Sequence, residues 1–182
     1  MSTYNKYNMS NKINKIPTKV VREYSKANNH MTWDEYFLNV LDSISARATC
    51  NRGRAACIFV RDNIILSTGY VGAPRGFDDC DHAGHLIETT KHLDGREVEH
   101  CVRTVHAEQN AICNAALNGI SLKGCTVYVS FTPCRVCAMM LVQLQTTRVV
   151  CNQKHSMATV GDEILRQAGI KVEYITTQQI KY

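Results

Sequence analysis

Long hydrophobic runs are missing from this 182-residue sequence, and their absence argues against a membrane protein. No uninterrupted apolar stretch approaches the roughly 18 residues that a membrane-spanning helix needs. The N-terminus is polar and has no apolar segment of the kind found in signal peptides, and one arginine among many asparagines does not fit an organelle transit sequence. We therefore expect a cytoplasmic protein without a membrane partner.

An excess of charge is also missing from most of the chain. The formal net charge is +5, but six of the 21 Lys and Arg residues and one of the 16 acidic residues precede Met31, which leaves 15 of each sign from there onward. A domain that grips a nucleic-acid backbone normally presents a basic face, because phosphate neutralisation supplies most nonspecific affinity. The neutral body therefore argues against a nucleic-acid partner.

The pattern of apolar residues divides the chain into an arm and one domain. Residues 1–30 are rich in Asn, Lys and Ser with little apolar periodicity, which predicts a flexible basic arm. Residues 31–182 have the length of a single domain. A capping-box helix is predicted from Thr32, followed by two short strands that form a hairpin around residues 61–63.

Strands and helices alternate in the last third of the chain. Helices are predicted over residues 107–118, 134–145 and 161–168, and strands over 126–131, 148–151 and 170–175. Alternation of this kind implies a partly parallel sheet that is covered on both faces. The predicted fold class is α/β, with three αβα layers and a mixed, roughly five-stranded sheet. Residues 71–102 have no sustained period and are far longer than a usual loop, so we expect something to pin them.

Nine cysteines in a chain without an export signal are more typical of thiols or metal ligands than of disulfides. Four of them lie in apolar or helical surroundings and are expected to be buried thiols: Cys57, Cys113, Cys125 and Cys151. Five remain to be explained: Cys50, Cys80, Cys101, Cys134 and Cys137.

The segment TPCRVC, residues 132–137, places two of these cysteines at a predicted helix start. Thr132 can cap the helix, and Pro133 suits its first position because proline has no N–H to leave unpaired. Cys134 and Cys137 then lie three apart on one face, where the positive end of the helix dipole favours thiolates. The pair is typical of a metal site, although a thioredoxin-like redox pair is an alternative.

The segment TVHAEQNA, residues 104–111, supplies a third ligand and a carboxylate. With His106, the two sulfurs would form a tetrahedral zinc site that keeps one position open for water, as catalytic zinc sites do. Glu108 can share this site only if His106 precedes the regular helix, because residues two apart on a helix point about 200° apart. A carboxylate there can pass a proton from water to a leaving group. The alternative is that His106 caps the helix and Glu108 only complements its dipole.

The combination of HAE and PCRVC resembles the cytidine deaminase superfamily. The stretches GAPRG, HCVRTVHAEQNAI and GCTVYVSFTPCRVCAMMLVQ more closely resemble its deoxycytidylate deaminases, including phage enzymes and late-competence proteins of bacteria. This resemblance implies hydrolysis of dCMP to dUMP and ammonia, which supplies dUMP for thymidylate synthesis. It assigns His106, Cys134 and Cys137 as zinc ligands and Glu108 as the acid and base.

The same resemblance implies several further properties. Such enzymes are oligomers, often hexamers, that dCTP activates and dTTP inhibits, so nucleoside triphosphate effectors with Mg²⁺ are expected. The family usually reads GYNG where this chain has Gly69, Tyr70, Val71 and Gly72, and valine cannot replace an amide hydrogen bond. Three further residues are then candidates for nucleotide contact, although each could equally be a solvated surface residue: Asn51, Arg52 and Arg75.

A second zinc site is predicted from the remaining cysteines and from the histidines of the long segment. The expected ligands, which would pin that segment, are Cys50, Cys80, His85 and His100, with Cys101 or His82 as substitutes. Some phage relatives carry a comparable structural zinc. Free thiols and exposed histidines are the alternative, because spacing alone does not fix geometry.

Two other functions fit parts of the pattern. A tRNA adenosine deaminase shares the HAE and PCxxC elements, although a base extracted from folded RNA calls for stronger phosphate binding than a neutral body offers. A non-enzymatic, zinc-stabilised interaction domain would explain the cysteines but has no use for Glu108.

Overall fold

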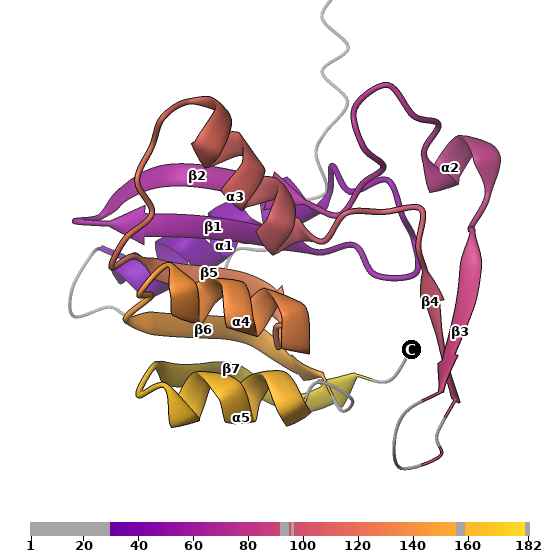
Figure 1. Cartoon of the computed structure of the whole chain (residues 1–182). Helices are drawn as coiled ribbons and strands as arrows, with labels where there is room; N and C mark the ends of the chain where they lie inside the picture. Colours follow the sequence, from indigo (N-terminus) through magenta and orange to yellow (C-terminus); the bar gives the residue numbers. More distant parts are fainter. Residues whose placement is uncertain (1–29, 92–94, 96, 156–158, 181–182) are drawn as a thin grey trace, which may run out of the picture. The chain divides into compact units, whose positions relative to one another are not determined.

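The computed structural model of this chain describes residues 30–91, 95, 97–155 and 159–180. For residues 177–180 it describes the backbone alone. The elements described here belong to one compact unit, Thr32–Tyr182 (Figure 1). The arm predicted for residues 1–30 falls outside the described residues except for His30. Among the described helices, none combines the length and apolar character that crossing a membrane requires.

A mixed sheet of five strands forms the centre of the domain, in the order β2-β1-β5-β6-β7 (Figure 1). The first three strands in this order pair antiparallel, whereas β5, β6 and β7 run parallel. The strands are β1 (Ala56–Arg61), β2 (Ile64–Tyr70), β5 (Thr126–Phe131), β6 (Arg148–His155) and β7 (Lys171–Ile180). The predicted hairpin is confirmed, and Asp62 and Asn63 form its turn with φ of 53° and 60°, as a type I′ turn requires.

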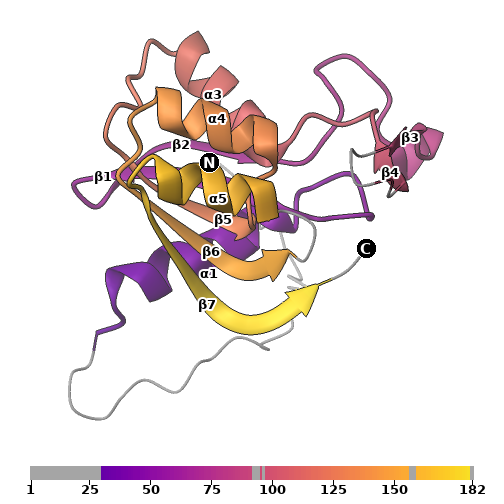
Figure 2. The ribbon, with the colours of Figure 1, turned by 60° about the horizontal axis from the view of Figure 1, so that its bottom comes forward.

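Helices cover both faces of the sheet, which confirms the predicted three-layer fold (Figure 2). On one face lies α1 (Trp33–Ser45), whose Phe37 and Leu41 pack against Ile58 and Val150. The other face carries α3 (Ala107–Leu117), α4 (Arg135–Gln143) and α5 (Thr159–Gln167). The capping box at Thr32 is also confirmed, since the Thr32 N–H donates to Glu35 Oε2 at 2.8 Å and the Glu35 N–H to Thr32 Oγ1 at 3.2 Å.

The segment between β2 and α3 leaves the sheet as an excursion, which we define as residues 73–102 (Figure 1). It contains the short helix α2 (Cys80–Ala83) and a separate two-stranded sheet of β3 (Ile87–Lys91) and β4 (Glu97–Cys101). Sequence patterns did not predict this hairpin, because all five residues of β3 are exposed and the strand has no apolar face. A two-stranded hairpin is marginally stable alone, so the excursion needs another source of order.

Two glycines allow the starts of α3 and α4 to be packed closely. A Cβ at Gly69 in β2 would lie 2.2 Å from the Ala107 carbonyl oxygen, so α3 begins directly on the sheet. A Cβ at Gly161 in α5 would lie 1.9 Å from the Pro133 carbonyl oxygen, just before α4. Any larger residue would force these backbones apart.

Candidate metal centres

His106 is positioned by the start of α3. It is the N-cap residue, with extended φ and ψ of −67° and 153°, and its N–H donates to Gln109 Oε1 at 3.1 Å. Glu108 lies in the first helical turn and is buried, with 8% of its surface exposed. The expectation that His106 precedes the helix and that Glu108 lies in its first turn is therefore confirmed.

The start of α4 differs by two residues from the prediction. The helix begins at Arg135 and Cys134 is its N-cap, so the capping assigned to Thr132 and the first position assigned to Pro133 are wrong. The Thr132 hydroxyl instead accepts the His155 N–H at 3.1 Å and donates to Tyr174 Oη at 3.4 Å. Cys134 as N-cap and Cys137 in the first turn still lie on one side of the helix start.

The two helix starts bring His106, Cys134 and Cys137 together, a group we call the His106 centre. His106 Nδ1 lies 3.6 Å from Cys134 Sγ and 3.5 Å from Cys137 Sγ. Tetrahedral zinc with its usual bond lengths separates nitrogen and sulfur ligands by about 3.6 Å, so these donors fit the ion. His106 is exposed, Cys134 is half-buried and Cys137 is buried, which leaves the centre open to solvent on one side.

The electrostatics of the His106 centre shift the pKa values of Cys134 and Glu108 in opposite directions. The pKa of Cys134 falls to about 3, first because the Cys137 side chain hydrogen-bonds to it and then because His106 does. Burial raises the pKa of Glu108, while the neighbouring His106 opposes this shift. Hydrogen bonding by the Cys137 side chain also lowers the pKa of Glu108 and so opposes the effect of burial.

A second group of donors joins the excursion to the rest of the domain. We call it the Cys50 cluster, and its ligand atoms lie within 4.8 Å of one another: Cys50, Cys80, His85 and Cys101. Cys80 Sγ is 3.5 Å from Cys101 Sγ, and Cys50 Sγ is 3.7 Å from His85 Nδ1. These separations fit tetrahedral zinc, for which sulfur ligands lie about 3.8 Å apart and sulfur and nitrogen about 3.6 Å.

Cys101 occupies the place that the sequence assigned to His100. The two residues are neighbours in β4, and successive side chains of a strand point to opposite faces. His100 stands opposite Glu88 in the hairpin and is exposed, so this predicted ligand is corrected to its neighbour. His82, named as another substitute, is also outside the cluster, and its Nδ1 contacts Asp79 Oδ1 at 2.7 Å.

Asn51 supports the Cys50 cluster and was not predicted to do so. Its Oδ1 lies 2.9 Å from His85 Nε2, so that nitrogen carries the proton and Nδ1 keeps the lone pair that a metal needs. In the sequence, the only indication of this role is that Asn51 directly follows Cys50. Such an outer hydrogen bond is typical of a histidine that binds a metal.

The other proposed nucleotide contacts lie apart from any described pocket. Arg52 donates to the Glu99 carbonyl oxygen at 3.3 Å and lies 3.8 Å from its carboxylate, so it contacts the hairpin. Arg75 is exposed in the loop after β2. Val71 packs against the core, and its N–H donates to the Ala55 carbonyl oxygen at 2.9 Å, so its side chain has a structural place.

Comparisons with known proteins identify the family of this chain. The family described as the cytidine and deoxycytidylate deaminase zinc-binding region matches residues 31–153. A deoxycytidylate deaminase of Schizosaccharomyces pombe is 30% identical over 79% of this chain, which spans 44% of that relative's length. The deoxycytidylate deaminase of Enterobacteria phage T4 is 31% identical, over 74% of this chain and 86% of its own.

A solved structure shows the same arrangement of elements. The dCMP deaminase of cyanophage S-TIM5, in complex with dCMP and dUMP, superposes with a TM-score of 0.64 at 27% identity, over 80% of this chain and 100% of that one. The family match includes the residues of both the His106 centre and the Cys50 cluster. The chain therefore belongs to the cytidine and deoxycytidylate deaminase family, which carries a zinc-binding region.

Proposed function

We propose that this protein is a zinc-dependent hydrolase that deaminates dCMP to dUMP and ammonia and so provides dUMP for thymidylate synthesis. The observation that carries this proposal is the convergence of His106 Nδ1 and two cysteine sulfurs, at 3.5 and 3.6 Å, beside buried Glu108. The choice of dCMP is supported by the relatives named above, including the phage deaminase solved with dCMP and dUMP.

The residues of the His106 centre have separable tasks in this reaction. His106, Cys134 and Cys137 would hold zinc, which when bound acts as a Lewis acid and lowers the pKa of a coordinated water to about 7. Water adds to the ring carbon that bears the amino group, the C–N bond breaks, and the nitrogen leaves as ammonia. Glu108 moves the protons, since its carboxylate takes the two protons of the attacking water in turn and delivers one to the ring nitrogen and the other to the departing amine.

Burial suits Glu108 for this task. A raised pKa makes the Glu108 carboxylate a stronger base than an ordinary surface carboxylate, so it takes a proton from the attacking water more readily. Glu108 lies in the first turn of α3, two residues after the ligand His106. Protons would therefore reach the substrate from the side of the metal ligands.

We further propose that the Cys50 cluster holds a second zinc ion with a structural task. Four protein donors, three sulfurs and one nitrogen, are typical of closed structural sites. Asn51, hydrogen-bonded to His85, supports this assignment over free thiols, because it fixes the ring with Nδ1 toward Cys50.

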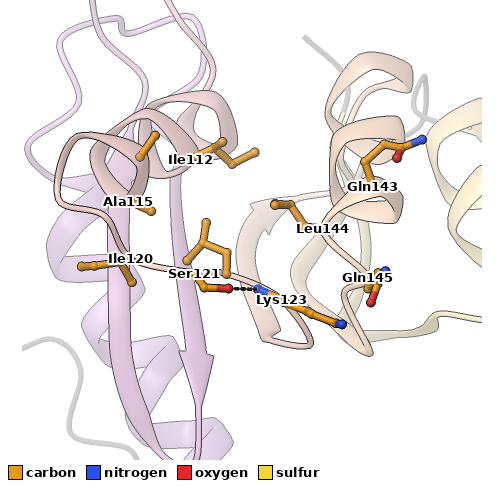
Figure 3. A pocket seen from close by; sticks show the side chains of 10 residues that line it. Ile112, Ala115, Ile120, Ser121, Lys123, Gln143, Leu144 and Gln145 are labelled. Carbon is orange, nitrogen blue, oxygen red and sulfur yellow. Dashed lines mark hydrogen bonds between the residues drawn. The ribbon is translucent and has the colours of Figure 1, made fainter.

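We also propose a homo-oligomer, with the hexamer implied by the resemblance as the expected form, and the outer face of α3 and α4 supports it. Within α3 the only charged residue is Glu108, which is buried, and α4 contains only Arg135. Leu117 is 76% exposed and Met139 49% exposed on these helices. Between their C-terminal ends lies a cavity of about 300 Å³ with a largely apolar lining (Figure 3). A surface with few charged side chains, here Arg135 and the Lys123 that lines the cavity, and with exposed apolar ones is typical of a subunit interface.

The oligomer is tested by sedimentation of a Leu117→Asp variant, with Leu86→Asp as the control. Both leucines are exposed, but Leu86 precedes the β3–β4 hairpin. We expect only Leu117→Asp to reduce the mass. An unchanged mass for both variants would contradict this interface.

The substrate is tested by ammonia release from dCMP, CMP, dCTP, deoxycytidine and tRNA, with dCTP and dTTP added as effectors in the presence of Mg²⁺. We expect dCMP to be the preferred substrate, dCTP to activate and dTTP to inhibit. Activity on tRNA alone would reject the proposed substrate, and a response to neither triphosphate would reject the regulation.

A further inference from the structure

The four members of the Cys50 cluster come from two parts of the domain. Cys50 follows α1 and is 2% exposed, so it belongs to the packed body. Cys80, His85 and Cys101 all lie in the excursion. A metal bound by all four donors would therefore tie the excursion to the body, and Cys50 is the only body ligand among them.

The sulfurs of the cluster are arranged so that two of them can react with each other. Cys80 Sγ lies 3.5 Å from Cys101 Sγ, and both belong to the excursion, whereas Cys50 Sγ faces His85 Nδ1 at 3.7 Å. Cys101 is half-buried and His85 is exposed, so a small oxidant can reach the cluster from this side. Cys80, which is 7% exposed, can act as the second thiol from within.

We propose that the Cys50 cluster is a thiol oxidation site, in which a peroxide links Cys80 to Cys101 and releases the metal. This inference rests on the second zinc ion of the proposed function. The Cys101 thiolate attacks one peroxide oxygen, the O–O bond breaks, and a sulfenic acid and one water form after proton uptake. The Cys80 thiolate then attacks that sulfur, a disulfide forms, and the sulfenic oxygen leaves as a second water. Two electrons pass from the two sulfurs to the peroxide.

The disulfide would change which parts of the domain are joined. A link between Cys80 and Cys101 closes the excursion on itself, but it leaves Cys50 without a bond to it. The remaining contacts are weaker: they include the Arg54–Asp81 ion pair at 3.6 Å, the Arg52–Glu99 ion pair at 3.8 Å and the hydrogen bond between Asn51 and His85. Solvent-accessible ion pairs of this kind contribute little. Oxidation would thus release the excursion from the body.

The excursion leads directly to the His106 centre, so its release has a consequence for the ligand. Val102 N–H donates to the Leu86 carbonyl oxygen at 2.8 Å, and Val105 N–H donates to the Gly72 carbonyl oxygen at 2.9 Å. Arg103 Nε donates to the Gly84 carbonyl oxygen at 2.9 Å. The contacts of Val102 and Arg103 tie the segment before His106 to the excursion, whereas the contact of Val105 with Gly72 ties it to the body. His106 lies five residues after Cys101, so a loosened excursion would leave this segment held from the body side alone.

The other thiols of the chain differ in their surroundings. Cys57, Cys125 and Cys151 are fully buried. Cys113 is exposed, so the prediction that it is a buried thiol is wrong. It belongs to neither cysteine group, which makes it a suitable control. Cys134 and Cys137 are the competing pair, because both lie at the His106 centre.

The experiment treats the zinc-loaded, full-length protein with hydrogen peroxide and follows zinc release with a chromogenic chelator. Disulfides are then mapped by mass spectrometry of proteolytic peptides. We expect release of one of two zinc equivalents, a Cys80–Cys101 disulfide, and faster cleavage of the excursion by added protease. Reduction and added zinc should reverse all three. A disulfide at Cys134 and Cys137 alone, or loss of zinc without a Cys80–Cys101 link, would overturn the proposal.

Two variants make the result specific. Cys101→Ser should lose the disulfide, whereas Cys113→Ser should give the wild-type disulfide and the wild-type zinc release. Mapping the wild-type protein needs no variant, so the test holds even if Cys101→Ser folds poorly.

If the mapped disulfide forms in a protein that does not deaminate dCMP, only the proposed deaminase activity fails. An active deaminase that keeps both zinc equivalents under peroxide would contradict only the oxidation site. An active deaminase that purifies with one zinc equivalent would contradict both the oxidation site and the second zinc ion, but not the deaminase activity.

Discussion

The His106 centre and the Cys50 cluster use the same kinds of donors but are built from different kinds of structure. The first is formed by two helix starts on a packed sheet, and its histidine is exposed. The second has four protein donors and joins a loop, a one-turn helix and a hairpin strand. The difference indicates that a zinc site with three protein ligands on packed helices suits catalysis, because its fourth coordination position is open to water. A zinc site with four protein ligands suits the anchoring of a segment such as the excursion, which buries few apolar residues.

Removal of a ligand from the His106 centre gives the largest expected effect. Cys134→Ala should release the catalytic zinc and abolish ammonia formation, while the zinc of the Cys50 cluster stays bound. Metal analysis should therefore give one zinc equivalent per chain instead of two. Retention of both equivalents would show that Cys134 is not a ligand.

Glu108→Gln tests the chemistry of the centre without removing its metal. The amide has nearly the shape of the carboxyl but cannot move protons, so kcat should fall by about 10²–10⁴. Zinc content and the melting temperature should stay at least at the wild-type value, because a buried amide avoids the cost of burying charge. Turnover within tenfold of wild type would contradict the assigned role.

The neighbours Cys101 and His100 give a matched test of the Cys50 cluster. Cys101→Ser should remove one zinc equivalent and reduce stability by about 2 kcal/mol, because the excursion loses its anchor. His100→Ser should change neither quantity, since this side chain is exposed on the opposite face of β4. Metal analysis and thermal unfolding would measure both. The reverse pattern would restore His100 as the ligand.

The dependence of the His106 centre on helix packing is tested by Gly161→Ala. The added methyl group would meet the Pro133 carbonyl oxygen, next to Cys134, so we expect a loss of about 1–3 kcal/mol in stability and a weaker catalytic zinc site. The Cys50 cluster should keep its zinc. Val160→Ala, on the exposed surface of the same helix, is the control and should stay within about 0.5 kcal/mol. Equal losses of stability in the two variants would argue against the close contact between Gly161 and the Pro133 carbonyl oxygen.

The smallest expected effect lies on the other face of the sheet, away from both centres. Arg148 Nη1 and Nη2 donate to the Asp34 carboxylate at 2.8 and 2.7 Å, and this hydrogen bonding lowers the pKa of Asp34. A lowered folded pKa means that the pair stabilises the protein above the ordinary carboxyl pKa, and that this contribution is lost as the pH falls through the folded value.

Asp34→Asn should therefore cost about 1 kcal/mol at neutral pH, a small value because solvent screens this partly exposed pair. The variant should also lose less stability than wild type on acidification below about pH 4. Chemical denaturation across this pH range is the measurement, and parallel curves for the two proteins would contradict the assignment.

The sequence predicted those parts of the molecule in which local chemistry fixes local structure. The Thr32 capping box, the turn at Asp62 and Asn63, and the position of His106 before α3 all follow from residues within four positions of each other. The β3–β4 hairpin escaped prediction because its exposed strands carry no core-facing period. The helix start at Cys134 was placed too early because Thr132 and Pro133 also have the chemistry of helix starts.

The Cys50 cluster shows the limit of spacing as a guide. Three of the four residues brought together were first choices, and the fourth, Cys101, was named as a substitute. The choice between His100 and Cys101 depends on which face of β4 meets α2. A shift of one residue in a strand reverses every side chain, and no pattern in β4 fixes this register. The role of Asn51 depends on the same tertiary contact.

Anomalous diffraction at the zinc edge from crystals of the full chain would test the account most directly. It should show two zinc peaks, one among His106, Cys134 and Cys137 with a fourth position filled by a non-protein atom, and one enclosed by Cys50, Cys80, His85 and Cys101. A single peak, or a first peak with four protein ligands, would contradict the division into an open catalytic centre and a closed anchor.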